Sequence, residues 1–369
     1  MNILFVCAGL GGGGAEKVAV NLANTMSSKG EHVTIYYRPG GEAQNYKISP
    51  AVTLVRAYGY GLVKRIFNLK KLIDKSFFDA VISFTDTPNI DAYIALKLSR
   101  KKAVFIPTIH TNLAARDSKI KKSYYFYLIR HLHIRACDFA DKIVAVSDGG
   151  KQSLLDYYNL TDSKATTIYN PVIADSEELA CKYRNNNKEK IRLVAAGRLT
   201  KAKNYYLMID SFSVVKDRFD KEVFLDIYGE GELKDDLQKY IDLNCLNESV
   251  QLKGFSEDLA AVFSQSDLFV FSSDWEGFGN VIVEALCAGI PVISTDCASG
   301  PREILADGKF GRLVPVGNVD AFSAAIEEEV NNPLFFSQNE LRKHLENFRE
   351  ETVAQKYIDL VTHVKSDQA

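Results

Sequence analysis

The sequence predicts an α/β protein with two parallel-sheet domains. Short apolar runs rich in β-branched residues alternate with helical patterns along the chain, as in parallel sheets wound with helices. The 369 residues exceed what one hydrophobic core usually organises, so two domains of roughly 150 to 200 residues are expected. A polar, charged stretch interrupts the alternation near the middle of the chain and indicates the boundary.

Five strand candidates define the first domain, which we expect to span residues 1–170. The segment 171–190 that follows is polar and charged, as is typical of a linker. The five runs are ILFVC (3–7), HVTIYY (32–37), AVISF (80–84), AVFIPTI (103–109) and KIVAVS (142–147).

Five further strand candidates define the second domain, which we expect to span residues 191–349. A last helical stretch over 350–369 has no strand after it, so we expect a C-terminal helix that crosses back to the first domain. The runs are IRLVAAG (191–197), VFLDIYG (223–229), SVQLKGF (249–255), DLFVFSS (267–273) and IPVIS (290–294).

Composition excludes several classes of protein. With 46% hydrophobic and 25% charged residues, the chain is ordinary globular material. It has no run of about 18 apolar residues that would span a bilayer, and its first residues lack the pattern of a secretion signal. Six cysteines stand singly, so we expect a cytoplasmic protein with reduced thiols and neither a disulfide frame nor a metal site.

The densest functional signal is DLFVFSSDWEGFGNVIVEALCAGIPVIS (267–294). Glu284 lies in a predicted helix that is apolar on nearly every face, where an unpaired carboxylate would cost several kcal/mol. A vicinal diol suits such a carboxylate, because two hydroxyls can donate to its two oxygens, as a ribose does in dinucleotide sites. The other interpretation is a structural pair between Glu284 and a lysine or a backbone amide.

The position of Glu276 favours a ligand of Glu284 over a structural pair. Glu276 precedes Glu284 with the Glu-x7-Glu spacing of retaining glycosyltransferases, and the surrounding residues resemble glycosyltransferase family 4. This resemblance covers essentially the whole chain and implies the GT-B fold, two Rossmann-like parallel-sheet domains facing across a cleft. It also implies that Glu276 contacts hydroxyls of the donor sugar and that Phe278, Gly279 and Asn280 line the donor site.

Other stretches resemble family elements in the same order along the chain. GRLTKAKN (197–204) would make Arg198 and Lys203 the cations on the donor diphosphate, and YGEGE (228–232) would place Gly229 and Gly231 near the nucleotide base. SGPREIL (299–305) and GRLVPVGN (311–318) match later family stretches.

The chemistry of Arg198 and Lys203 also suits the diphosphate of a nucleotide sugar. Transfer of a sugar from a nucleotide diphosphate depends on stabilising the departing anion, and an arginine fork and a lysine both suit phosphate oxygens. Asp-x-Asp does not occur in the sequence, and no cluster has metal-ligand spacing, so we expect cations in place of Mg²⁺ and no cofactor. The expected donor is a UDP-sugar.

The first glycine-rich loop, GLGGGG (9–14), has the Gly-x-Gly-x-x-Gly spacing of a dinucleotide site. With Arg38 at the end of the second strand, an NADP-dependent oxidoreductase is an alternative function. The family resemblance instead implies an acceptor-side loop in which Gly13 and Gly14 bring backbone amides close to a phosphate. A tight strand-to-helix turn that binds no ligand is the third interpretation.

His110 follows a buried strand, at the edge of the sheet where ligands lie. The resemblance implies contact with the donor sugar, while a structural hydrogen bond is the other interpretation. The resemblance also implies a front-face mechanism in which the leaving phosphate takes the acceptor proton, so no protein nucleophile is assigned.

Charge separates the two halves. Residues 1–170 carry 23 Lys and Arg against 13 Asp and Glu, and the remainder 22 against 34. The segment KIKKSYYFYLIRHLHIR (119–135) mixes basic and aromatic residues at helical spacing. This pattern suits an anionic lipid surface and a polyprenyl-diphosphate-linked acceptor, or else an ordinary surface helix.

Nothing in the sequence resembles a nucleic-acid-binding pattern, so no nucleic acid partner is expected. The leading hypothesis is a metal-independent, retaining transferase of a hexose or N-acetylhexosamine, acting on a lipid-linked bacterial glycan at the inner face of the membrane. The alternatives are the oxidoreductase and a non-catalytic sensor of sugar nucleotides.

Overall fold

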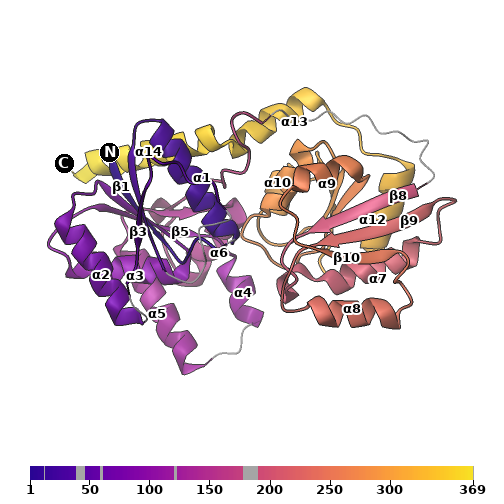
Figure 1. The fold of residues 1–369 in the computed structure, drawn as a ribbon, viewed down its shortest axis with the longest axis horizontal. Coiled ribbons are helices and arrows are strands. Elements are labelled where there is room, and N and C mark those ends of the chain that lie inside the picture. Colours follow the sequence, from indigo (N-terminus) through magenta and orange to yellow (C-terminus); the bar gives the residue numbers. More distant parts are fainter. Residues whose placement is uncertain (12, 39–45, 59–60, 120–122, 178–189, 369) are drawn as a thin grey trace. The chain divides into compact units, whose positions relative to one another are not determined.

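The computed structural model describes residues 1–11, 13–38, 46–58, 61–119, 123–177 and 190–368 (Figure 1). The chain divides into two compact units. The first comprises Met1–Asp175 together with Asn347–Ala369, and the second comprises Ser176–Glu346. The division after Asp175 falls within the segment 171–190 expected as a linker, of which 178–189 lie outside the described residues.

The first unit is built on a seven-stranded sheet in the order β3-β2-β1-β4-β5-β6-β7, and all its strand pairs are parallel. The sequence did not indicate β3 and β7, because β3 is a mostly exposed edge strand and β7 has only three residues. The strands are β1 (Asn2–Cys7), β2 (His32–Tyr37), β3 (Thr53–Arg56), β4 (Ala80–Phe84), β5 (Val104–Ile109), β6 (Ile143–Ala145) and β7 (Ala165–Thr167).

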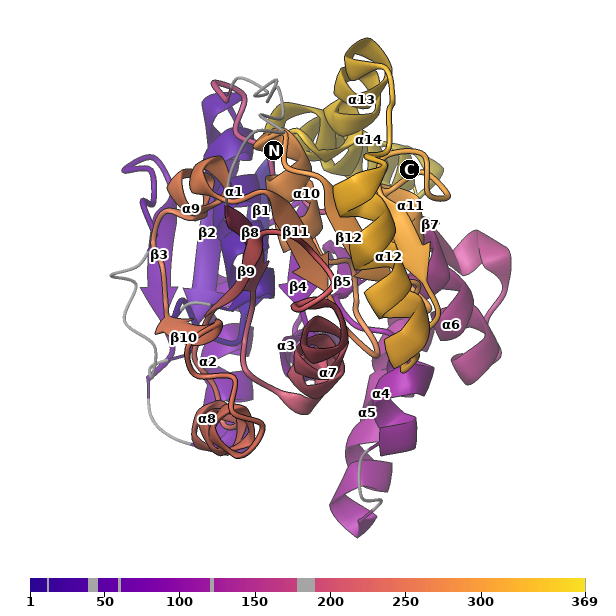
Figure 2. The same cartoon turned by 90° about the vertical axis from the view of Figure 1, so that its right-hand side faces the viewer.

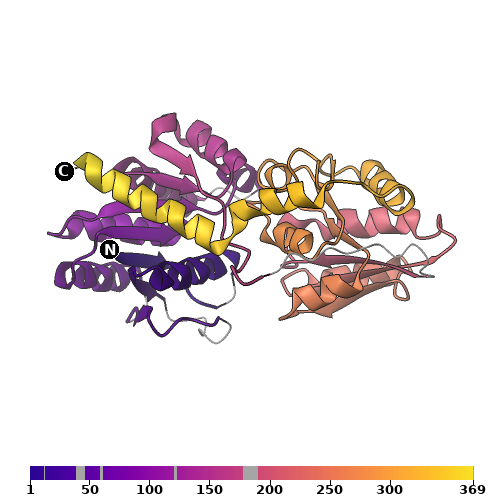
Figure 3. The same ribbon diagram turned by 90° about the horizontal axis from the view of Figure 1, so that it is seen from above.

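Helices cover both faces of this sheet. Alternate residues of β1 point to opposite faces: Ile3 and Phe5 pack with α1 and α14, while Leu4 and Val6 pack with α2, α3, α5 and α6. Figure 3 shows the yellow C-terminal helix α14 running along the first unit. The helices are α1 (Gly14–Ser28), α2 (Leu62–Lys75), α3 (Asp86–Leu98), α4 (Leu113–Lys119), α5 (Tyr124–Phe139), α6 (Asp148–Tyr158) and α14 (Glu350–Gln368).

The second unit has a six-stranded parallel sheet in the order β10-β9-β8-β11-β12-β13, most of which can be followed in Figure 2. The short strand β13 was not indicated by the sequence. The strands are β8 (Lys190–Ala196), β9 (Glu222–Tyr228), β10 (Val250–Gly254), β11 (Leu268–Phe271), β12 (Val292–Thr295) and β13 (Arg312–Val314). The helices are α7 (Tyr205–Val215), α8 (Lys234–Leu243), α9 (Leu259–Gln265), α10 (Asn280–Cys287), α11 (Pro301–Ile304), α12 (Val319–Asn331) and α13 (Gln338–Leu345).

The predicted α/β class with two parallel sheets is confirmed. In each sheet the strand order reverses once, between β1 and β4 in the first unit and between β8 and β11 in the second. Ligands of open α/β sheets bind beyond the carboxyl ends of the strands at such a switch point. A ligand site is therefore expected in the loops that follow these four strands.

Among the described residues, no helix combines the length and the apolar composition needed to cross a bilayer.

Candidate functional site

The loops after β8 and β11 are tied to each other at the switch point of the second sheet. The backbone N–H of Asp274 donates to the carbonyl of Ala202 at 2.8 Å, and Asn204 Nδ2 donates to Asp274 Oδ1 at 2.8 Å. Ser272 Oγ donates to the carbonyl of Lys203 at 2.8 Å. These bonds fix the loop after β11 against the short 3₁₀ turn Lys201–Lys203 that follows β8.

Lys203 and Glu276 form an ion pair at this junction. Lys203 Nζ donates to Glu276 Oε1, and Ser273 Oγ donates to the same oxygen at 2.7 Å. The two charged side chains are only 19% and 13% exposed, and the ammonium lies 4.7 Å from the centroid of the Phe271 ring. Within the described part of the chain, Glu276 Oε2 accepts no hydrogen bond, so this oxygen remains as an acceptor for a ligand.

Hydroxyl groups behind this pair support the loop. Thr295 Oγ1 donates to the carbonyl of Ser273 at 2.6 Å, and Ser299 Oγ donates to the carbonyl of Glu276 at 3.1 Å. Ser273 and Thr295 are fully buried. None of these three hydroxyl residues was expected to be functional from the sequence. Ser273 ends a predicted strand, Thr295 follows one, and Ser299 begins the stretch SGPREIL that resembles a family element.

Arg198 and Lys203 belong to the same turn after β8. A Cβ placed on Gly197 would lie 3.4 Å from Lys203 Cε, so the lysine side chain runs past the residue that precedes Arg198. Arg198 is exposed, and Tyr205 Oη donates to the carbonyl of Gly197 at 3.0 Å. Of these two cations, Arg198 is exposed and Lys203 is mostly buried, and their contact with a diphosphate stays a prediction.

Gly229 and Gly231 are required by the packing of two loops. A Cβ on Gly229 would lie 1.9 Å from the carbonyl oxygen of Gly197, and one on Gly231 would lie 2.4 Å from that of Leu199. The N–H of Leu199 donates to the carbonyl of Glu230 at 2.9 Å. These contacts explain both glycines without a ligand, and their place beside a nucleotide base stays a prediction.

Glu284 lies on the partly exposed side of α10. Gly279, with φ of 104°, caps the helix, which then buries Ile282, Val283, Ala285, Leu286 and Cys287. Glu284 itself is half-buried, as are Asn280 and Val281 one turn earlier. The expectation of a carboxylate embedded in apolar surroundings was therefore wrong, because residues three and four apart share one helix face and this face is partly open. Phe278, just before the cap, is 2% exposed.

In the first unit, His110 follows β5 and is held as a neutral imidazole. Thr108 Oγ1 donates to the carbonyl of Ser83 at 2.9 Å, so its contact of 2.8 Å with His110 Nε2 has the ring N–H as donor. Burial lowers the pKa of His110 to about 4, although the charge of Asp86 opposes this shift. Nδ1 is then the acceptor nitrogen at neutral pH.

The first glycine loop is closed by its own helix. Glu16 Oε2 accepts from the backbone N–H of Gly11 at 2.8 Å and of Gly13 at 3.1 Å, and α1 begins at Gly14. Gly12 lies outside the described residues. Of the two amides expected to approach a phosphate, that of Gly13 is therefore bonded to a carboxylate of the chain itself, which a phosphate would have to displace.

Arg38 is held by a buried carboxylate. Its Nη2 donates to Asp91 Oδ2 at 3.1 Å, and Arg65 makes two further bonds to Asp91 at 2.9 and 3.1 Å. Asp91 is 2% exposed. Two arginines are thus used to satisfy one buried charge on α3, and this structural role explains Arg38 without an NADP phosphate.

The helix expected to face a membrane is α5, together with part of the segment before it. Its first turns expose Tyr124, Tyr125, Tyr127 and Leu128 to solvent. Residues 120–122, which include two of the expected lysines, lie outside the described residues. Among the residues that are described, no group of three or more His, Cys, Asp or Glu side chains is arranged to hold a metal ion.

Comparisons with known proteins identify the family. Residues 12–176 match the model for "Glycosyltransferase Family 4", and residues 176–352 match the model for "Glycosyl transferases group 1". An uncharacterized glycosyltransferase of Methanocaldococcus jannaschii is 31% identical over 67% of this chain and 62% of its own length.

A second relative has a defined substrate. The N-acetylgalactosamine-N,N'-diacetylbacillosaminyl-diphospho-undecaprenol 4-alpha-N-acetylgalactosaminyltransferase of Campylobacter jejuni is 29% identical over 84% of both chains. Among solved structures, HepE of Anabaena in complex with UDP matches with a TM-score of 0.76 at 18% identity, covering 98% of this chain and 100% of that one. The NADP-dependent oxidoreductase alternative is not supported, since both halves of the chain match glycosyltransferase models.

Proposed function

Because the chain belongs to glycosyltransferase family 4, we propose that it transfers a hexose or N-acetylhexosamine from a UDP-sugar to a polyprenyl-diphosphate-linked glycan. The transfer retains the configuration at the anomeric carbon and serves the assembly of a bacterial glycan. The observation that carries this proposal is the Lys203–Glu276 pair at the switch point of the second sheet.

The donor diphosphate is held by the turn after β8. Arg198 and Lys203 supply two positive charges, and phosphate oxygens are bound most strongly by charged donors of this kind. A cation that neutralises the departing diphosphate lowers the barrier, because negative charge builds up there in the transition state. With these two side chains in place, no metal ion is needed for that step.

Glu276 positions the donor sugar. Its Oε1 is engaged by Lys203 and Ser273, so the carboxylate has a fixed orientation and offers Oε2 to a sugar hydroxyl. The same lysine contacts the diphosphate and the carboxylate, which places the sugar and its leaving group side by side. The leaving phosphate takes the acceptor proton, and no protein nucleophile takes part.

The nucleotide is recognised by the neighbouring elements. Glu284, on the partly open face of α10, accepts from the ribose hydroxyls, while the adjoining loops with Gly229 and Gly231 face the base. Phe278 and the amides at Gly279 and Asn280 complete the donor site. The choice of UDP draws on HepE, whose fold is similar and which was solved with UDP.

The acceptor is bound by the first unit, near a membrane surface. The relative from Campylobacter jejuni acts on a diphospho-undecaprenol glycan. The first 170 residues carry an excess of basic residues, and α5 exposes Tyr124, Tyr125 and Tyr127. A basic helix with exposed aromatic residues suits an anionic lipid surface.

The proposal is tested by product analysis. The protein is incubated with UDP-glucose, UDP-galactose, UDP-GlcNAc or UDP-GalNAc and with undecaprenyl-diphosphate-linked N-acetylhexosamines, in buffer with EDTA. We expect one donor to yield UDP and an extended glycan with retained anomeric configuration, read by NMR. Binding of UDP-sugars without transfer to any of these acceptors would instead indicate a sensor.

A further inference from the structure

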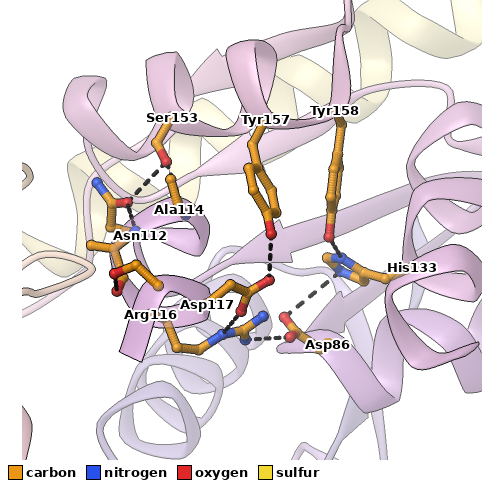
Figure 4. A network of polar contacts seen from close by, with 11 residues as sticks. Asp86, Asn112, Ala114, Arg116, Asp117, His133, Ser153, Tyr157 and Tyr158 are labelled. Carbon is orange, nitrogen blue, oxygen red and sulfur yellow. Dashed lines mark hydrogen bonds and ion pairs between the residues drawn. The ribbon is translucent and has the colours of Figure 1, made fainter. Parts of the chain in front are cut away.

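Outside the donor site, a group of connected charged side chains lies at the switch point of the first sheet (Figure 4). Asp86 is the first residue of α3 and follows β4, and Arg116 lies in α4, which follows the neighbouring strand β5. Both residues therefore lie at the edge of the sheet where ligands bind.

Arg116 bridges two carboxylates. Its Nε donates to Asp117 Oδ1 at 2.8 Å, and its Nη1 donates to Asp86 Oδ2. Asp117 is 2% exposed and also accepts from Tyr157 Oη at 3.0 Å. Among the described residues, two of the five N–H groups of Arg116 are used by these carboxylates, so others remain for a ligand.

His133 does not neutralise Asp86. Asn89 Nδ2 approaches His133 Nε2 at 3.2 Å as a donor, so Nε2 is the acceptor nitrogen and the proton lies on Nδ1, 2.8 Å from Tyr158 Oη. Burial lowers the pKa of His133, which agrees with a neutral ring. Asp86 Oδ1 lies 3.7 Å from Nε2 and receives no proton from it.

The accessible part of this group is a single pair of opposite charges. Asp86 and Arg116 keep 22% and 27% of their side chains exposed, whereas Asp117 and His133 are buried beneath them. Arg130 lies over the Tyr157 ring, with its Cζ 4.3 Å from the ring centroid. A ligand at the surface therefore meets an acceptor and several donors side by side, and this exposed pair of described side chains carries no net charge.

We propose that Asp86 and Arg116 bind neighbouring hydroxyl groups of the acceptor sugar, an inference that rests on the proposed transfer reaction. One hydroxyl donates to Asp86, and the oxygen of the next accepts from Arg116. The buried Asp117 holds the Arg116 guanidinium from behind, so the donor side of the site is fixed before the sugar arrives. Asp86 and Arg116 are binding residues for the sugar, while the diphosphate of the acceptor is held elsewhere.

Saturation-transfer NMR on the full chain tests this inference. The probes are the methyl α-glycosides of glucose, galactose, GlcNAc and GalNAc, recorded with excess UDP. Asp86→Asn keeps the shape of the side chain and removes its charge. Asp91→Asn, which breaks a buried arginine pair on the same helix α3, is the matched control. Loss of one hydrogen bond to a charged group predicts binding about 10- to 100-fold weaker.

The inference holds if at least one glycoside binds the wild type and Asp91→Asn equally and binds Asp86→Asn more weakly. It is overturned if no glycoside binds the wild type, if both variants behave alike, or if inorganic pyrophosphate competes for the site. A loss of UDP-sugar affinity relative to UDP in Asp86→Asn would assign the pair to the donor sugar and also overturn it.

Two further measurements keep the outcomes separate. If Asp86→Asn fails to fold in a thermal melt, Arg116→Lys takes its place, because it retains a positive charge between the carboxylates and loses the planar fork. Calorimetric titration of UDP into the wild type tests the proposed function alone. Absence of UDP binding would refute that function, whereas the glycoside comparison decides the role of Asp86.

Discussion

Replacing Lys203 by methionine removes the cation beside Glu276 while keeping an unbranched side chain over the Phe271 ring. The pair is only 19% and 13% exposed, so the carboxylate would lose its partner in a poorly hydrated place. Removing one member of a buried pair costs about 3 to 5 kcal/mol, and the remaining 2.7 Å bond from Ser273 favours the lower end. At roughly 2 to 4 °C per kcal/mol, the second unit should melt about 6 to 12 °C lower.

Activity should fall further than stability. Lys203 also supports the leaving diphosphate, and loss of one such electrostatic contact typically lowers kcat by about 10²- to 10³-fold. The matched control is Lys309→Met, because Lys309 also pairs with a glutamate, Glu340 at 2.9 Å, and lies over the Phe310 ring, but the Lys309 and Glu340 side chains are both about half exposed. That surface pair is worth roughly 0 to 1 kcal/mol.

The measurements are thermal unfolding, UDP titration and steady-state transfer at saturating acceptor. The role of the Lys203–Glu276 pair would be refuted if Lys203→Met melts at the same temperature as the Lys309→Met control and keeps kcat/KM within about threefold of wild type.

Three further predictions concern single residues. Ser273→Ala removes one donor from Glu276, so kcat/KM should fall about 10- to 100-fold with little change in UDP affinity; an unchanged rate would contradict the positioning role. Gly231→Ala places a methyl group 2.4 Å from the carbonyl oxygen of Leu199, so the loops must separate. We expect a loss of about 1 to 3 kcal/mol in stability and weaker UDP binding by calorimetry, and unchanged values for both would contradict the close packing. The pKa of His110 is lowered to about 4, so between pH 4 and 6.5 the unfolded chain binds more protons than the folded one. Acidification over that range should therefore lower the free energy of unfolding by up to about 3 kcal/mol. Denaturant titrations should show a smaller loss in His110→Gln, and an equal loss in both proteins would contradict this.

The sequence indicated the fold well, for local reasons. Buried parallel strands are continuous apolar runs, and the residues that follow them lie at one edge of the sheet, so Lys203 and Glu276 could be placed there. The strands β3, β7 and β13 escaped notice because a strand of three or four residues carries too little pattern to separate it from a loop.

The contacts that complete the sites depend on residues far apart in the chain. Arg38 and Asp91 are 53 positions apart, so no local pattern indicates that this arginine is neutralised. The bond from Ser273 to Glu276 is local, but it depends on a loop geometry set by contacts with the turn after β8. The open face of Glu284 depends on which side of α10 its neighbours cover.

Glu16 makes contacts that the sequence did not predict, although its partners are only a few residues away. The glycine spacing predicts exposed backbone amides, but in the folded protein the carboxylate of the following helix already accepts from those of Gly11 and Gly13.

A crystal structure of the protein with UDP bound tests the central claim most directly. We expect the diphosphate within hydrogen-bond distance of Arg198 and Lys203, and the ribose hydroxyls on Glu284. A nucleotide bound to the glycine loop of the first unit, or a diphosphate that touches neither cation, would contradict it.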